Sequence, residues 1–276
     1  MIGVRISISI LVFLLTLSSL GYTAPDGMEE VNGSDVFARK STFLLAMNDG
    51  TKLATDLYLP DGYPGTDTVG SILIRTPYAR GDYSYLTDDG YAVVCQSFRS
   101  RFGSEGTFQF FNDCYSDGYD TIQWMASQEW SKGKIVTLGS SALGKAQYFA
   151  AASSPANLTG QVIMFATPDL YLDVFYPGGE FQKTIVEGWL SGIGEEDRLP
   201  RIYSNENFTM EEYRNITNRG RWSNISIPSL MVGGWYDALT DGILRGFMGY
   251  QYRGGEGARG RSKLIMGPWT HGANSN

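Results

Sequence analysis

The stretch that decides the fold of this chain runs from Ile135 to Ala152 and reads IVTLGSSALGKAQYFAAA. Its first residues are apolar or β-branched, which favours a buried strand, and its last residues are helix formers. Between them lies a tight turn, Gly139-Ser-Ser-Ala-Leu-Gly144. A strand, a sharp turn and a helix in this order lift the central serine, Ser141, clear of a sheet and above a helix N-terminus. The stretch therefore predicts an α/β fold and marks Ser141 as a candidate nucleophile.

The spacing of this turn is G-x-S-x-x-G, one residue longer than the usual G-x-S-x-G of a nucleophile elbow. Glycine and serine also build ordinary turns, so the short match by itself leaves open that Ser141 is a plain turn residue. The remainder of the chain has to decide between these two interpretations.

The composition is that of a folded protein with one large domain or one domain with an insertion. The chain has 276 residues, 42% of them hydrophobic and 18% charged, which is enough to bury a substantial core. A net charge of −7 without a basic cluster argues against a nucleic-acid partner. A single histidine, His271, and two cysteines, Cys95 and Cys114, argue against a zinc or iron site. Whether the two cysteines pair is left open.

The first 24 residues have the pattern of a secretory signal peptide. Arg5 precedes an apolar core from Ile6 to Leu20, and Ser19-Leu-Gly21 or Thr23-Ala24 offers a cleavage site. This pattern predicts a secreted or extracytoplasmic protein without a stable membrane span; an uncleaved N-terminal anchor is the alternative. Five Asn-x-Ser/Thr sequons fit a secreted glycoprotein, and they lie at Asn32, Asn157, Asn207, Asn215 and Asn224.

The mature chain, residues 25–276, alternates apolar strands with helices after an initial hairpin around Asn48-Asp-Gly50. Strands are expected near 71–75, 91–95, 135–138, 161–165, 227–237 and 262–271, and helices near 113–128, 145–152 and 239–250. This alternation predicts a mostly parallel sheet covered on both faces. The pattern breaks between about 168 and 226, where we expect a short cap insertion with helical stretches near 181–190 and 210–217.

Three residues at predicted strand ends supply the parts of a serine hydrolase. A serine hydroxyl needs a base to take its proton, and that base needs an acid to orient it. Ser141, Asp237 and His271 each follow a predicted strand, and the carboxyl ends of parallel strands meet at one edge. Taken singly they fit a turn residue, a helix N-cap and a loop residue. Their order is that of α/β-hydrolases, so together they predict an α/β-hydrolase fold with a Ser-His-Asp triad.

Further motifs are distributed from about residue 41 to residue 271. They are Met47-Asn-Asp-Gly-Thr-Lys-Leu-Ala-Thr-Asp-Leu-Tyr58, Arg75-Thr-Pro-Tyr78, Asp89-Gly-Tyr-Ala-Val-Val94, Arg99 with Ser104-Glu-Gly106, Asp117-Gly-Tyr-Asp-Thr-Ile-Gln-Trp124 with Trp130, Gly234-Trp-Tyr-Asp237 and Gly267-Pro-Trp-Thr-His271. In these motifs the chain resembles hydrolases of the CocE/NonD family, which are cocaine-esterase-like or Xaa-Pro dipeptidyl-peptidase-like. The six-residue turn G-x-S-x-x-G is usual in that family.

The resemblance implies a role for each candidate residue. Ser141 is the nucleophile, His271 the general base and acid, and Asp237 the acid that orients the histidine. Tyr78 and the backbone N–H of Ala142 form the oxyanion hole, although a Pro-Tyr pair in a loop also fits simple packing. The resemblance implies a small-molecule ester or peptide substrate and neither a cofactor nor a metal.

Three features depart from the family pattern. Ala142 follows the nucleophile where the family usually has tyrosine, and the cap segment is short. Relatives also continue past the histidine with a helix and a C-terminal β-sandwich, so we expect a member truncated after His271.

These features predict a secreted serine hydrolase that cleaves ester or amide bonds through an acyl-enzyme, with an acyl esterase as the first choice. An Xaa-Pro dipeptidyl-peptidase is the alternative, and it would need cap carboxylates to hold a free amine. Four glutamates are available for this role, though they fit a solvated face as well: Glu180, Glu187, Glu195 and Glu196. A further alternative is a non-catalytic secreted binding module on a truncated hydrolase fold.

Overall fold

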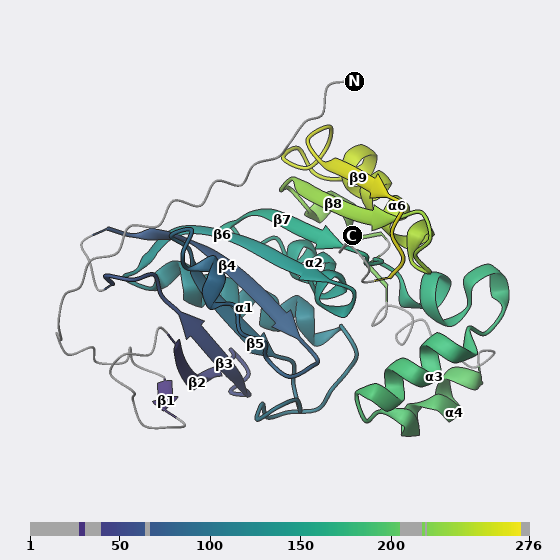
Figure 1. Ribbon diagram of the computed structural model, residues 1–276, viewed down its shortest axis with the longest axis horizontal. Coiled ribbons are helices and arrows are strands. Elements are labelled where there is room, and N and C mark those ends of the chain that lie inside the picture. The colour runs from purple at the N-terminus through teal and green to yellow at the C-terminus, as the bar shows by residue number, and fades with distance from the viewer. Residues whose placement is uncertain (1–27, 31–39, 64–66, 205–216, 219, 272–276) are drawn as a thin grey trace.

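One sheet organises the protein, whose computed structural model describes residues 28–30, 40–63, 67–204, 217–218 and 220–271 (Figure 1). Within these ranges the sheet has nine strands in the order β1-β2-β3-β5-β4-β6-β7-β8-β9. The strands are β1 (Met28–Glu30), β2 (Lys40–Ala46), β3 (Lys52–Tyr58), β4 (Val69–Thr76), β5 (Ala92–Ser97), β6 (Ser131–Ser140), β7 (Leu158–Met164), β8 (Ser229–Gly234) and β9 (Lys263–Gly267). From β5 to β9 neighbouring strands run parallel, and from β1 to β5 they run antiparallel. The predicted α/β fold with a mostly parallel sheet is confirmed.

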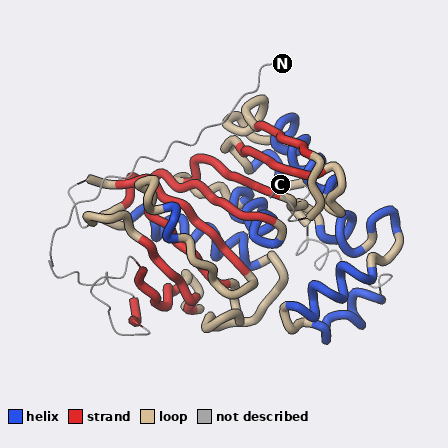
Figure 2. The backbone as a smooth tube through the Cα atoms, in the orientation of Figure 1, coloured by secondary structure: helices blue, strands red, loops and turns tan. Residues whose placement is uncertain are grey.

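The helices are α1 (Asp113–Ser127), α2 (Ala142–Ala152), α3 (Lys183–Gly192), α4 (Leu199–Tyr203) and α6 (Thr240–Met248). The helices α1 and α2 pack against each other and against β6. The segment between β7 and β8 carries α3 and α4, which lie to one side of the sheet, beyond the ends of the parallel strands (Figure 2). This segment is where the sequence predicted a cap.

Burial along the strands follows their place in the sheet. All six residues of β5 are buried, as are the last six of β4, because central parallel strands are covered on both faces. Strand β2 pairs in register with β3 across the predicted hairpin turn, and its buried residues Phe43 and Leu45 alternate with the partly buried Thr42 and Leu44. The carboxyl ends of the parallel strands are thereby held at one edge of a rigid sheet.

Several sequence predictions fall partly or wholly outside the described residues. These are the signal peptide, the helical stretch predicted at 210–217, of which only Thr217 is described, and the sequons at Asn32, Asn207 and Asn215. No helix within the described ranges has the length and apolar character needed to cross a membrane. Both cysteines are unpaired and buried, and burial raises the pKa of each thiol to about 12.

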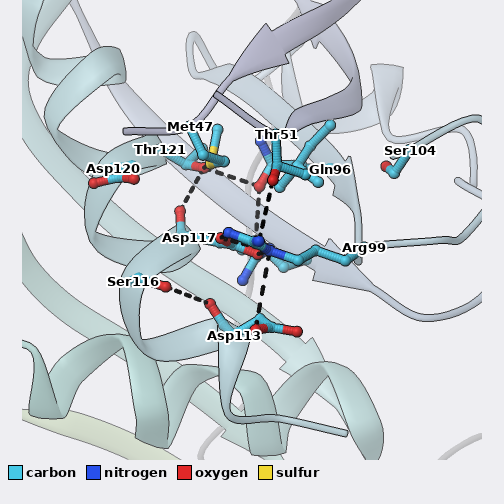
Figure 3. Close-up of polar contacts among 12 residues, drawn as sticks. Met47, Thr51, Gln96, Arg99, Ser104, Asp113, Ser116, Asp117, Asp120 and Thr121 are labelled. Atoms are coloured by element: carbon cyan, nitrogen blue, oxygen red, sulfur yellow. Dashed lines mark hydrogen bonds and ion pairs between the residues drawn. The ribbon is translucent and has the colours of Figure 1, made fainter. Parts of the chain in front are cut away.

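A network of charged side chains, mostly buried, joins the hairpin turn, α1 and the strand ends (Figure 3). Asp117 on α1 accepts hydrogen bonds from Arg99 at 2.7 Å and from Arg75, at the end of β4, at 3.2 Å. Arg99 also donates to Asp49 in the hairpin turn at 2.6 Å. Because the side chains of Asp117 and Arg75 are almost fully buried, their charges are compensated by each other rather than by water. The network fixes the end of β4, from which Tyr78 follows.

Replacement of Asp117 by asparagine leaves two guanidinium groups inside the protein without their main counter-charge. We expect Asp117→Asn to lower the free energy of unfolding by about 3 kcal/mol, measured by urea denaturation. The exposed Glu129 offers a matched control, and Glu129→Gln is expected to change stability by less than about 0.5 kcal/mol. Equal stability of the two variants would contradict the role given to the network.

Candidate active site

Ser141 occupies a strained turn between β6 and α2. Its φ of 56° and ψ of −122° lie outside the regions that L-residues ordinarily populate. The turn is held by two hydrogen bonds: the Ser141 N–H donates to the Met164 carbonyl at 3.0 Å, and the Lys145 N–H donates to the Ser141 carbonyl at 2.8 Å. Strain that the surroundings maintain in this way is typical of the residue that presents a nucleophile.

Two glycines explain the six-residue spacing of the turn. A Cβ atom at Gly139 would lie 2.5 Å from the Cβ of Leu143, and one at Gly144 would lie 2.6 Å from the Cβ of Ala166. Both positions therefore exclude any side chain, because α2 approaches β6 and the start of the next loop at backbone distance. This close approach explains why the pattern G-x-S-x-x-G has glycine at its first and last positions.

The structure brings together the three residues that the sequence placed at strand ends. Nδ1 of His271 lies 2.8 Å from Oδ1 of Asp237, and its Nε2 lies 2.9 Å from Oγ of Ser141. The Asp237 carboxylate is fully buried and also accepts a hydrogen bond from the Leu239 N–H at 3.0 Å. With its proton on Nδ1, facing the carboxylate, the imidazole has its Nε2 lone pair free to accept the serine proton.

The loop that carries His271 is fastened to the loop after β8. The N–H of Trp235 donates to the Gly267 carbonyl at 2.9 Å, and the N–H of Tyr236 donates to the Trp269 carbonyl at 3.1 Å. A Cβ at Gly234 would overlap the Trp269 carbonyl, so the two loops touch through backbone. Histidine and aspartate are therefore held against each other by their flanking residues.

Tyr78 and Ala142, the two predicted oxyanion donors, line the same cavity as Ser141. The Tyr78 hydroxyl accepts a hydrogen bond from Nε1 of Trp189, on α3, at 3.1 Å, which leaves its own proton free to donate. Burial raises the pKa of Tyr78, so the phenol keeps that proton at neutral pH. Ala142 is the first residue of α2, and an N–H at this position has no acceptor within its own helix.

A cavity of about 340 Å³ opens onto these groups. Its walls are mostly apolar and come from α2, α3 and the loops after β7 and β8. The lining residues are Tyr78, Ser141, Ala142, Lys145, Thr167, Leu170, Val174, Ile185, Trp189, Ala238, Leu239 and His271. Such a cavity, with a few polar groups converging on one point, is the usual form of a small-molecule site.

Among the cavity residues that the sequence did not single out are Trp189 and Lys145. Trp189 lies in a segment whose helical pattern says nothing about its partner, which is 111 residues earlier in the chain. Lys145 is the one charged residue in the alanine-rich sequence of α2, and this isolated charge was a signal that the sequence offered. In the structure nearly every residue of α2 is buried.

The cap glutamates considered for amine binding do not line the cavity. Glu195 pairs with Arg101 and Arg198, and Glu187 accepts a hydrogen bond from Tyr203. The described part of the chain also contains no cluster of histidine, cysteine and carboxylate side chains that could hold a metal ion.

Comparison with known proteins places the chain among hydrolases. Residues 49–211 and 202–273 match the profile of the X-Pro dipeptidyl-peptidase (S15) family. The cocaine esterase of Rhodococcus sp. (strain MB1 Bresler) is 28% identical over 287 residues, which covers 84% of this chain and 48% of the esterase. The chain thus spans about half the length of this curated relative.

Solved structures show the same fold. A CocE/NonD family hydrolase from Staphylococcus aureus superposes with a TM-score of 0.70 at 19% identity, over 84% of this chain and 47% of that one. An α-amino acid ester hydrolase superposes with a TM-score of 0.66 at 19% identity, over 90% of this chain and 52% of that one. Since the family profile matches most of the chain, this protein belongs to the X-Pro dipeptidyl-peptidase (S15) family.

Proposed function

We propose that the protein is a serine hydrolase that cleaves carboxylic esters through an acyl-enzyme. The observation that carries the proposal is the unbroken line from Asp237 through His271 to Ser141, with separations of 2.8 and 2.9 Å, at the mouth of the apolar cavity. A nucleophile, a base and an orienting acid within hydrogen-bond reach are what acyl transfer requires.

In the first half of the reaction, Oγ of Ser141 attacks the ester carbonyl carbon while Nε2 of His271 takes the hydroxyl proton. The tetrahedral intermediate then collapses: the bond between the carbonyl carbon and the alcohol oxygen breaks, and His271 returns its proton to that oxygen. In the second half, water attacks the acyl-serine and gives a proton to Nε2. The Ser141 oxygen leaves with that proton, which releases the acid and restores the enzyme.

The oxyanion of each intermediate is stabilised by two donors, the Tyr78 hydroxyl and the Ala142 N–H. Both are fixed before substrate binds, one by Trp189 and the other by its place at the start of α2. Donors that need no reorganisation act most strongly in a site from which water is excluded.

The cavity favours an ester over a peptide with a free N-terminus. A dipeptidyl-peptidase has to hold a substrate ammonium, which a carboxylate does best. None of the described residues that line the cavity is an aspartate or glutamate, and its buried ionisable side chain is instead a lysine. We therefore place ester hydrolysis ahead of Xaa-Pro peptide cleavage.

We also propose that the protein is secreted, on the pattern of residues 1–24. N-terminal sequencing of protein recovered from the medium of expressing cells tests this. A mature N-terminus near residue 22 or 25 is the expected result, and retention of Met1 in the cell would contradict it.

Loss of the Ser141 hydroxyl should remove the nucleophile and with it both activity and labelling. We expect Ser141→Ala to lower kcat for p-nitrophenyl butyrate by about 10⁴-fold or more and to abolish labelling by a fluorophosphonate. The neighbouring Ser140 is a matched control, and Ser140→Ala should retain both. Equal labelling of wild type and Ser141→Ala would end the serine-hydrolase proposal and favour a non-catalytic binding module.

Loss of the Tyr78 hydroxyl should act on the transition state rather than on substrate binding. We expect Tyr78→Phe to lower kcat by about 10²-fold with little change in KM, as removal of one oxyanion donor does. Trp189→Phe keeps an aromatic side chain but removes one ring of the indole together with the N–H that holds Tyr78. We expect it to lower kcat by about tenfold or more, of which one lost hydrogen bond accounts for about tenfold. Steady-state kinetics would refute this account if Tyr78→Phe raised KM alone.

A matched pair of peptide substrates separates the two hydrolase classes. The pair is Gly-Pro-p-nitroanilide and its N-acetyl derivative, measured beside p-nitrophenyl butyrate. Because the cavity offers no carboxylate to an ammonium, we expect no preference for the free amine and a kcat/KM for the ester that is larger by about 10³-fold or more. A clear preference for the free amine would instead identify a dipeptidyl-peptidase.

A further inference from the structure

Lys145 lies in a place where a lysine is costly. Its residue is only 2% exposed, and it belongs to the first turn of α2, where the helix dipole disfavours a cation. It also lines the cavity onto which Ser141 opens. An alanine or leucine would suit the helix and the core better, so the amino group is not there for stability.

The amino group has few partners of its own. Its Nζ lies 3.4 Å from the Thr167 carbonyl, a long hydrogen bond, and this is its one acceptor among the described residues. The rings of Phe111 and Phe149 lie 5.4 and 5.3 Å away and offer only their faces. Since an ammonium carries three N–H groups, two remain without a protein acceptor in the part of the chain that the structure describes.

The charges around Lys145 are sparse. Asp169 is the carboxylate that interacts electrostatically with Lys145. This carboxylate accepts hydrogen bonds from the Leu172 N–H and the Thr217 hydroxyl. The Cys114 thiol on α1 has a raised pKa and is neutral. Arg221 lies over the same Phe149 ring as Lys145, and His271 and Tyr78 line the cavity. Desolvation lowers the pKa of Lys145 to about 7, with Asp169 opposing the shift.

We propose that Lys145 binds a carboxylate carried on the acyl group of the substrate, so that half-esters of dicarboxylic acids are the preferred substrate class. The inference rests on the proposed ester hydrolysis, because the same cavity has to hold the acyl chain. Leu170, Val174 and Ile185 provide the apolar wall that a methylene chain needs. A carboxylate supplies the acceptor that Lys145 lacks, and it favours the charged form of the amino group in a site with little water.

The test uses the full chain and p-nitrophenyl esters that differ at the far end of the acyl group. The hydrogen glutarate and hydrogen adipate esters end in a carboxylate. Their neutral counterparts of equal carbon number, the pentanoate and hexanoate esters, end in a methyl group. The rate of spontaneous hydrolysis is subtracted for each ester. At pH 6.5 we expect kcat/KM for the better half-ester to exceed that of its neutral counterpart by about tenfold or more.

The dependence of this ratio on pH follows from the charge of Lys145. A lysine with a lowered pKa is charged below that value and neutral above it, so the ratio should fall toward one between about pH 7 and pH 9. Division by the neutral ester cancels the pH dependence of the catalytic steps that both reactions share. The half-ester carboxylate stays ionised throughout this range.

Two lysine variants complete the test. Lys145→Met keeps the volume and removes the amino group, and we expect the ratio to fall below one. Relief of a buried ionisable group should also raise the midpoint of thermal unfolding, by about 2 °C or more. Lys183, on the exposed face of α3 and outside the cavity, is the control, and Lys183→Met should leave the ratio unchanged.

The assignment of Lys145 is overturned if the wild-type ratio of kcat/KM, half-ester over neutral ester, is at or below one at pH 6.5. It is also overturned if Lys145→Met has the same ratio as wild type. If wild type hydrolyses neither kind of ester and takes no fluorophosphonate label, the proposed serine hydrolase itself fails. The two failures are thus distinguishable.

Discussion

The close packing of α2 against β6 is the constraint on which the rest of the site depends. The chain turns so tightly between β6 and α2 that neither Gly139 nor Gly144 has room for a side chain. That turn imposes the positive φ of Ser141 and places this residue directly before the first residue of α2. The parallel sheet then supplies the other groups, because β4, β8 and β9 end at the same edge as β6. Tyr78, Asp237 and His271 are thus brought to one site with Ser141, although they lie far from it and from one another in sequence.

Two buried cationic arrangements in this molecule contrast with each other. Arg75 and Arg99 are both paired with Asp117, whose carboxylate compensates their charges and links a hairpin, a strand end and a helix. Lys145 is also buried, but among the described residues its amino group has a single hydrogen-bond acceptor, the Thr167 carbonyl at 3.4 Å. Paired charges of the first kind hold the scaffold, whereas an incompletely satisfied charge beside a cavity is available to a ligand.

The segment between β7 and β8 has a part in the chemistry as well as in enclosure. It forms one wall of the cavity, and through Trp189 it holds the hydroxyl of Tyr78, which comes from the far side of the serine turn. In the proposed reaction, a change in this segment would alter both the acyl chain that fits the cavity and the strength of the hydrogen bond from Tyr78 to the oxyanion.

Most of the fold could be predicted from the sequence because its signals are local. Apolar runs, the Asn-Asp-Gly turn and the glycine spacing around Ser141 determined the strands, the hairpin and the turn, and strand-end positions singled out Asp237 and His271. Element boundaries were less accessible. Strand β6 begins at Ser131 rather than near Ile135 because it pairs there with Val69, a contact that depends on a distant strand. Only the tertiary structure decided that Trp189 holds Tyr78 and that Lys145 faces the cavity, because both depend on side chains that approach from remote segments, and no local pattern records such distances.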